Sequence, residues 1–89
     1  MFDWDANNIA HVEDHGFSTE DVEAAVTDPG RVSAPAYNQD GEKRKAVIGK
    51  TDDDVIIFVV TTRRGDQTRV VTARDAERNE KRRYRGRGK

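Results

Sequence analysis

Apolar positions in the first thirty residues recur at helical spacing and predict two short helices. Asp5 is the candidate N-cap of the first helix, which runs to about Asp14, and Gly16 can end it in a left-handed conformation. The second helix is predicted to begin at Ser18-Thr19, where acidic residues follow within one turn. It stops at the Asp-Pro-Gly sequence that ends at Gly30.

The period then changes to that of strands, separated by turns rich in Asp, Asn and Gly. The predicted strands are 31–37, 43–50, 55–62 and 67–74. The third is apolar on both faces, which indicates a central strand covered on each side. Asp75 is predicted to cap a final helix through Tyr84. Hairpin-length connections favour antiparallel pairing, so we expect an α+β fold with two N-terminal helices, an antiparallel four-stranded sheet and a C-terminal helix.

Composition limits the kind of site such a chain can hold. Eighty-nine residues with 34% hydrophobic and 37% charged positions form one small domain (1–84) with a thin core, which favours a shallow groove over a deep cofactor pocket. The chain has no cysteine and no apolar run long enough to cross a membrane, so we expect a cytoplasmic protein. The segment 85–89 has no apolar residue and is expected to be a disordered basic tail.

Charge is strongly polarised along the chain. Residues 1–30 contain eight acidic and no basic residues, residues 31–62 five of each, and residues 63–89 eleven basic against four acidic. The net charge of −1 therefore combines an acidic beginning with a basic, mostly arginine end. Arginine suits bidentate phosphate contacts, so the basic end is the candidate nucleic-acid surface. A solvated helix face or an acidic protein partner is the alternative interpretation.

Several short motifs, none specific alone, together resemble the BrnT family of toxins. They are Phe2-x-Trp4-Asp5, His15-Gly16, Asp28-Pro29, Gly41-Glu42-x-Arg44, Ile48-Gly49 and Arg69 to Arg74 with Glu80 and Tyr84. Asn8 stands where such chains often carry Lys, and this departure is what a divergent sister group of the family would show. The resemblance implies a RelE-like fold and a metal-independent endoribonuclease toxin that acts on mRNA or ribosome-associated RNA. It also implies a small antitoxin partner that binds DNA.

RNA can be cut without a metal when its own 2′-hydroxyl attacks the phosphate, and five residues are candidates for assisting that step. Arg64 and Arg74 would bind the scissile phosphate. Glu80 could be a general base, Tyr84 an acid or a stacking ring, and His15 an acid or base. Four of them also have a structural interpretation, in which Arg74 pairs with an acid on an N-terminal helix, Glu80 stabilises its own helix, Tyr84 holds that helix down and His15 caps a helix end.

Further arginines are candidates for RNA binding along the same surface. They are Arg44, Arg69, Arg78, Arg82 and Arg83. Arg69 and Arg74 lie five positions apart on one predicted strand, so we expect them on opposite faces. His11 and His15 have helical spacing for a metal, but no third ligand is apparent, and we predict neither metal nor cofactor. A non-catalytic nucleic-acid-binding or protein-interaction module, which could form a homodimer, is the alternative function.

Overall fold

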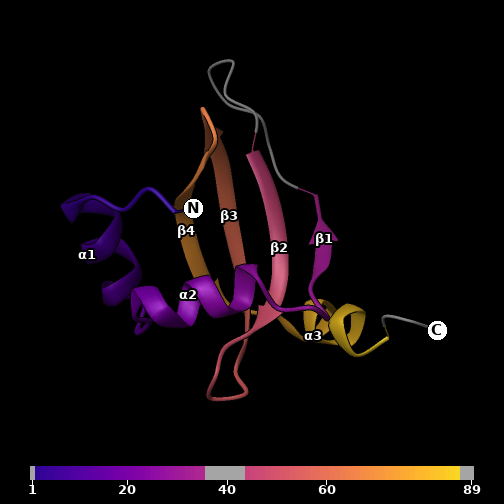
Figure 1. The fold of residues 1–89 in the computed structure, drawn as a ribbon. Helices are drawn as coiled ribbons and strands as arrows, with labels where there is room; N and C mark the ends of the chain where they lie inside the picture. Colours follow the sequence, from indigo (N-terminus) through magenta and orange to yellow (C-terminus); the bar gives the residue numbers. More distant parts are fainter. Residues whose placement is uncertain (1, 36–43, 87–89) are drawn as a thin grey trace.

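The computed structural model describes residues 2–35 and 44–86. Four strands form one antiparallel sheet in the order β1-β2-β3-β4, with helices packed against it (Figure 1). The elements are α1 (Ala6–Asp14), α2 (Thr19–Val26), β1 (Val32–Ala34), β2 (Arg44–Lys50), β3 (Ile56–Arg64), β4 (Gln67–Asp75) and α3 (Arg78–Arg85). The predicted α+β class and the order of its elements are confirmed.

The two N-terminal helices begin and end at the predicted local signals. The Asp5 carboxylate accepts a hydrogen bond from the Asn8 backbone N–H at 2.9 Å, and Gly16 follows α1 with a φ of +88°. Ser18 caps α2 and exchanges two hydrogen bonds with Asp21 in a capping box. These caps satisfy backbone N–H groups that have no partner within the helix.

The sheet is covered on both faces around β3. Ile57 and Val59 contribute to one buried cluster with side chains of α1 and α2, whereas Ile56 lies in a second cluster with Tyr84 of α3. Because side chains alternate between the faces of a strand, α1 and α2 pack on one face and α3 on the other. The prediction that this strand is covered on each side is confirmed.

The register between β3 and β4 shifts by one residue, which leaves Val71 as an extra residue in β4. Arg69 is therefore opposite Thr62, and Arg74 is opposite Phe58. Thr62 and Phe58 are four residues apart and share a face of β3, so both arginines begin from the face on which α3 packs. The prediction that they lie on opposite faces is wrong, because alternation along β4 is interrupted by the bulge.

The last helix does not begin at the predicted cap. Asp75 is still part of β4, where it pairs with Ile57, and Glu77 is the N-cap of α3. The prediction for Asp75 is wrong because strand pairing continues through it. α3 also includes Arg85, which was assigned to the tail, whereas residues 87–89 lie outside the described residues.

Two further strands differ in extent from the predictions. The edge strand predicted for residues 31–37 is observed at Val32–Ala34, and the turn predicted at 38–41 lies outside the described residues. β3 continues past Thr62 to Arg64, which leaves a two-residue hairpin turn. Within residues 2–35 and 44–86, no helix is long and apolar enough to span a membrane.

Candidate functional site

A groove of about 570 Å³ lies on the face of the sheet that carries α3. The helix has only eight residues and covers the end of the sheet near Ile48 and Ile56, so the strands beside it stay partly open. Strand side chains such as Phe58 and Val60 give the groove an apolar lining. Among the residues that the structure describes, its polar lining consists of Arg44, Thr72, Arg74, Asn79, Glu80 and Arg83. Three arginines and one carboxylate therefore border an apolar surface.

Arg74 is held in a defined orientation within this groove. Its guanidinium carbon lies 4.1 Å from the centroid of the Phe58 ring. Nη1 and Nη2 donate to the two carboxylate oxygens of Glu80 at 2.7 and 2.9 Å, so the acid that pairs with Arg74 belongs to α3 and not, as in the structural interpretation, to an N-terminal helix. Nη1 also donates to the backbone oxygen of Asp75 at 3.1 Å. Such a bidentate pair stacked on an aromatic ring fixes the plane of the cation while 39% of the side chain stays exposed.

Glu80 is engaged on two sides. Besides the pair with Arg74, its Oε1 accepts a hydrogen bond from the Glu77 backbone N–H at 2.8 Å, at the beginning of α3. The hydrogen bonds from Arg74 lower the pKa of Glu80, and the same pairing raises the pKa of Arg74. A carboxylate with a lowered pKa is a weaker proton acceptor near neutral pH. The geometry therefore suits Glu80 to positioning Arg74 more than to acting as a general base.

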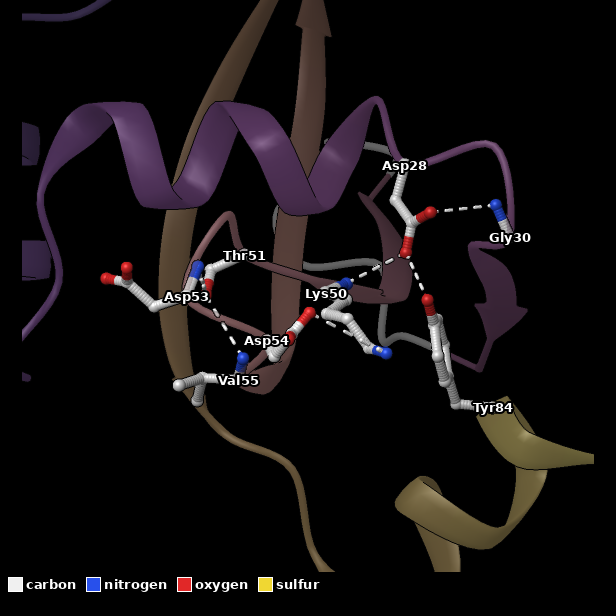
Figure 2. Close-up of polar contacts among 8 residues, drawn as sticks. All are labelled: Asp28, Gly30, Lys50, Thr51, Asp53, Asp54, Val55 and Tyr84. Atoms are coloured by element: carbon white, nitrogen blue, oxygen red, sulfur yellow. Dashed lines mark hydrogen bonds and ion pairs between the residues drawn. The ribbon is translucent and has the colours of Figure 1, made fainter.

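Tyr84 lies outside the lining of the groove. It is only 3% exposed, and its hydroxyl donates to Oδ2 of Asp28 at 2.5 Å. Asp28 also accepts backbone N–H groups of Gly30 at 2.8 Å and Lys50 at 3.0 Å (Figure 2). This carboxylate thus joins the end of α2, the end of β2 and α3. The contacts match the structural interpretation of Tyr84, in which it holds the last helix down.

Arg64 and Arg69 are not brought to Arg74. Arg64 ends β3 at the hairpin, six residues from Phe58, which is about 20 Å along a strand.

Arg69 is held by the N-terminal segment, with Nη2 3.0 Å from Oδ2 of Asp5 and Nη1 3.9 Å from Oδ2 of Asp3. A hydrogen bond from the Asn8 backbone N–H, together with the charge of Arg69, lowers the pKa of Asp5.

His11 lies on α1 beside β4, and His15 follows the last residue of that helix. His15 is exposed at the C-cap of α1, as its structural interpretation predicts, and its ring centroid is 5.0 Å from that of His11. His11 Nε2 lies 2.9 Å from the hydroxyl of Thr72, which lines the groove. Among the described residues, no three His, Cys, Asp or Glu side chains are grouped so that they could hold a metal ion.

The remaining predicted RNA-binding arginines divide between the groove and the open helix surface. Arg44 and Arg83 line the groove, and Arg83 donates to the backbone oxygen of Ser33 at 2.7 Å. Arg78 and Arg82 are exposed on α3 outside the lining. Sequence reasoning missed Phe58 as part of the site because it reads as one more apolar residue in a buried strand.

Comparison with known families identifies a matching family. A family profile described as "Ribonuclease toxin, BrnT, of type II toxin-antitoxin system" matches residues 4–80. The matched span includes Arg74, Glu80 and His11 and ends before Arg83. A search of curated proteins gave no significant match.

Proposed function

Since the chain belongs to the BrnT family of ribonuclease toxins from type II toxin–antitoxin systems, we propose that it cuts RNA in the groove beside α3. Membership of the family implies an RNA substrate and a cognate antitoxin. The proposal rests on the guanidinium of Arg74, which Glu80 and Phe58 hold in a fixed orientation at the border of the groove.

Some N–H groups of Arg74 remain available to donate to a phosphate. A guanidinium has five N–H groups, and the contacts with Glu80 and the Asp75 carbonyl use three of them. The other two can donate to the oxygens of a bound phosphate. Because the pair with Glu80 already fixes the guanidinium plane, little side-chain freedom is lost when the phosphate binds.

The proposed reaction needs no metal. The 2′-oxygen of the RNA attacks the adjacent phosphorus, the bond to the 5′-oxygen breaks, and a 2′,3′-cyclic phosphate forms. Arg74 stabilises the extra negative charge on the pentacoordinate phosphorus, as preorganised donors do at such sites. Arg44 and Arg83 bind neighbouring phosphates, and Glu80 keeps Arg74 in place.

The biological setting follows from the same proposal. The substrate is mRNA or ribosome-associated RNA in the cytoplasm, and the partner is a small antitoxin that also binds DNA. The antitoxin would block the toxin by covering the groove and its three arginines. A carboxylate-rich segment could satisfy these arginines in place of the RNA phosphates.

The test is cleavage of a labelled single-stranded RNA by the purified protein in the presence of EDTA. Arg74→Gln should lower the cleavage rate by about 10²- to 10³-fold, the usual cost of a lost oxyanion-type donor. Arg63→Gln removes an exposed arginine that does not line this groove and is the matched control. RNA that is bound but uncut would instead indicate a non-catalytic nucleic-acid-binding module. Absence of RNA binding at low salt would favour a protein-interaction module.

A further inference from the structure

We propose that His11 accepts the proton of the attacking 2′-hydroxyl through the hydroxyl of Thr72. The inference rests on the proposed cleavage in the groove and assigns one step of it. Neither residue is part of the arginine and glutamate pair described above. The contact that carries it is the 2.9 Å separation of His11 Nε2 and Thr72 Oγ1.

The described lining of the groove offers no other suitable proton acceptor. Its one carboxylate, Glu80, accepts hydrogen bonds from Arg74 and from the Glu77 backbone, and its pKa is lowered. Tyr84 is buried and donates to Asp28. Histidine is the side-chain type whose ordinary titration lies near neutral pH. A histidine that reaches the lining from outside therefore supplies the chemistry that the lining lacks.

The edge of the sheet brings the imidazole and the groove together. α1 lies beside β4, the edge strand (Figure 1), where the Asn8 side chain donates to the Val70 backbone oxygen at 2.9 Å. His11 is three residues further along α1, and its contact with Thr72 is displaced in the same direction along β4. These two contacts fix the helix along the strand and direct His11 to Thr72, which carries the one hydroxyl among the described residues that line the groove.

Thr72 is also close enough to Arg74 to act on the same phosphate group. The two residues are separated by one position on β4 and both line the groove, so their Cα atoms are about 7 Å apart. A phosphate held by Arg74 would place the neighbouring ribose within reach of the Thr72 hydroxyl. His11 itself is exposed at the strand edge, where solvent can remove the proton it has accepted.

Each proton in this step passes from a named donor to a named acceptor. The 2′-hydroxyl gives its proton to Thr72 Oγ1 while Thr72 gives its own proton to His11 Nε2, so the threonine is unchanged. The 2′-oxygen forms a bond to phosphorus, and the bond from phosphorus to the 5′-oxygen breaks. Water protonates the departing 5′-oxygen, and His11 returns its proton to solvent. The step requires His11 to begin neutral, with Nε2 as the acceptor.

The experiment is single-turnover cleavage of a labelled single-stranded RNA, with RNA affinity measured separately. His11→Ala should lower the cleavage rate by about 100-fold, in the range of general base contributions, and leave the affinity within about twofold. Added imidazole should restore much of the His11→Ala rate, because the position is open to solvent. Thr72→Val should lose a similar factor without rescue, and the double variant should lose no more than either single one.

Asn7→Ala is the matched control, since Asn7 is exposed one turn before His11 on the same side of α1. It should cleave at the rate of the unchanged protein. A normal rate for His11→Ala, or a loss that imidazole does not restore, would overturn the proposal. If Arg74→Gln still abolishes cleavage in that case, the proposed function stands without His11. If neither variant affects cleavage, the groove is not the site.

Discussion

Gly49→Ala should destabilise the protein more than the addition of a single methyl group suggests. Gly49 lies in β2 beneath α2, and a Cβ atom there would be 2.0 Å from the backbone oxygen of Ala25, 2.7 Å from its carbonyl carbon and 3.0 Å from its Cα. All three are backbone atoms, so no change of side-chain rotamer relieves the clash. The helix and the strand must instead move apart by about 1 Å or more, which opens the buried cluster around Val22.

Overpacking typically costs about 1–3 kcal/mol, and a clash between two backbones belongs at the upper end. A loss of about 3 kcal/mol corresponds to a fall in Tm of about 12–24 °C for a domain of this size. Thermal and urea unfolding of Gly49→Ala would measure it. Gly16→Ala is the control, because Gly16 has a φ of +88° and nothing within 4 Å, so its variant carries only about 1–2 kcal/mol of backbone strain. A smaller loss for Gly49→Ala than for Gly16→Ala would refute the close packing of α2 on β2.

Tyr84→Phe removes a buried donor to Asp28 and should cost about 1.5 kcal/mol, seen in urea unfolding, whereas an unchanged midpoint would mean that the hydrogen bond does not stabilise α3. Pairing with Arg74 lowers the pKa of Glu80 in the folded protein below its ordinary value of 4.5. The pair therefore stabilises the fold at pH values above 4.5, and this contribution is lost as the pH falls through the lowered pKa. Unfolding between pH 7 and pH 3 should show this loss, and Glu80→Gln should lack that part of the pH dependence. RNA affinity should fall steeply as the salt concentration rises, and Arg83→Gln should reduce the slope of log K against log salt by about 0.7. A salt titration measures this slope, and an unchanged slope would mean that Arg83 does not contact a phosphate.

Local signals in the sequence were sufficient for most of the fold. The caps at Asp5 and Ser18 and the helix end at Gly16 depend on residues within one turn, so they could be predicted without knowing the tertiary structure. The same kind of reasoning failed at Asp75. Its side chain suits an N-cap, but pairing with Ile57 on the neighbouring strand keeps it in the sheet.

The site was less predictable because it depends on contacts between distant segments. Glu80 was a candidate from its spacing to Arg74, and the structure brings these two together. Nothing near Tyr84 indicates that its hydroxyl meets Asp28, 56 residues earlier in the chain. Arg64 was predicted to bind the same phosphate as Arg74, but it lies at the hairpin end of β3, six residues from the Phe58 that is opposite Arg74. Charge identified the basic segment, and tertiary packing selected which arginines share a groove.

The bulge at Val71 also bears on how relatives of this chain can be aligned. Val70 and Ala73 are three residues apart, yet both lie in the cluster under α1 and α2, because the extra residue absorbs one step of the alternation. A relative with one residue fewer at this position would have a regular strand that keeps Arg74 on the same face. A one-residue deletion elsewhere in β4 would turn Arg74 toward α1 and α2 unless a second change compensated for it. Natural length variation in this strand should therefore collect at position 71.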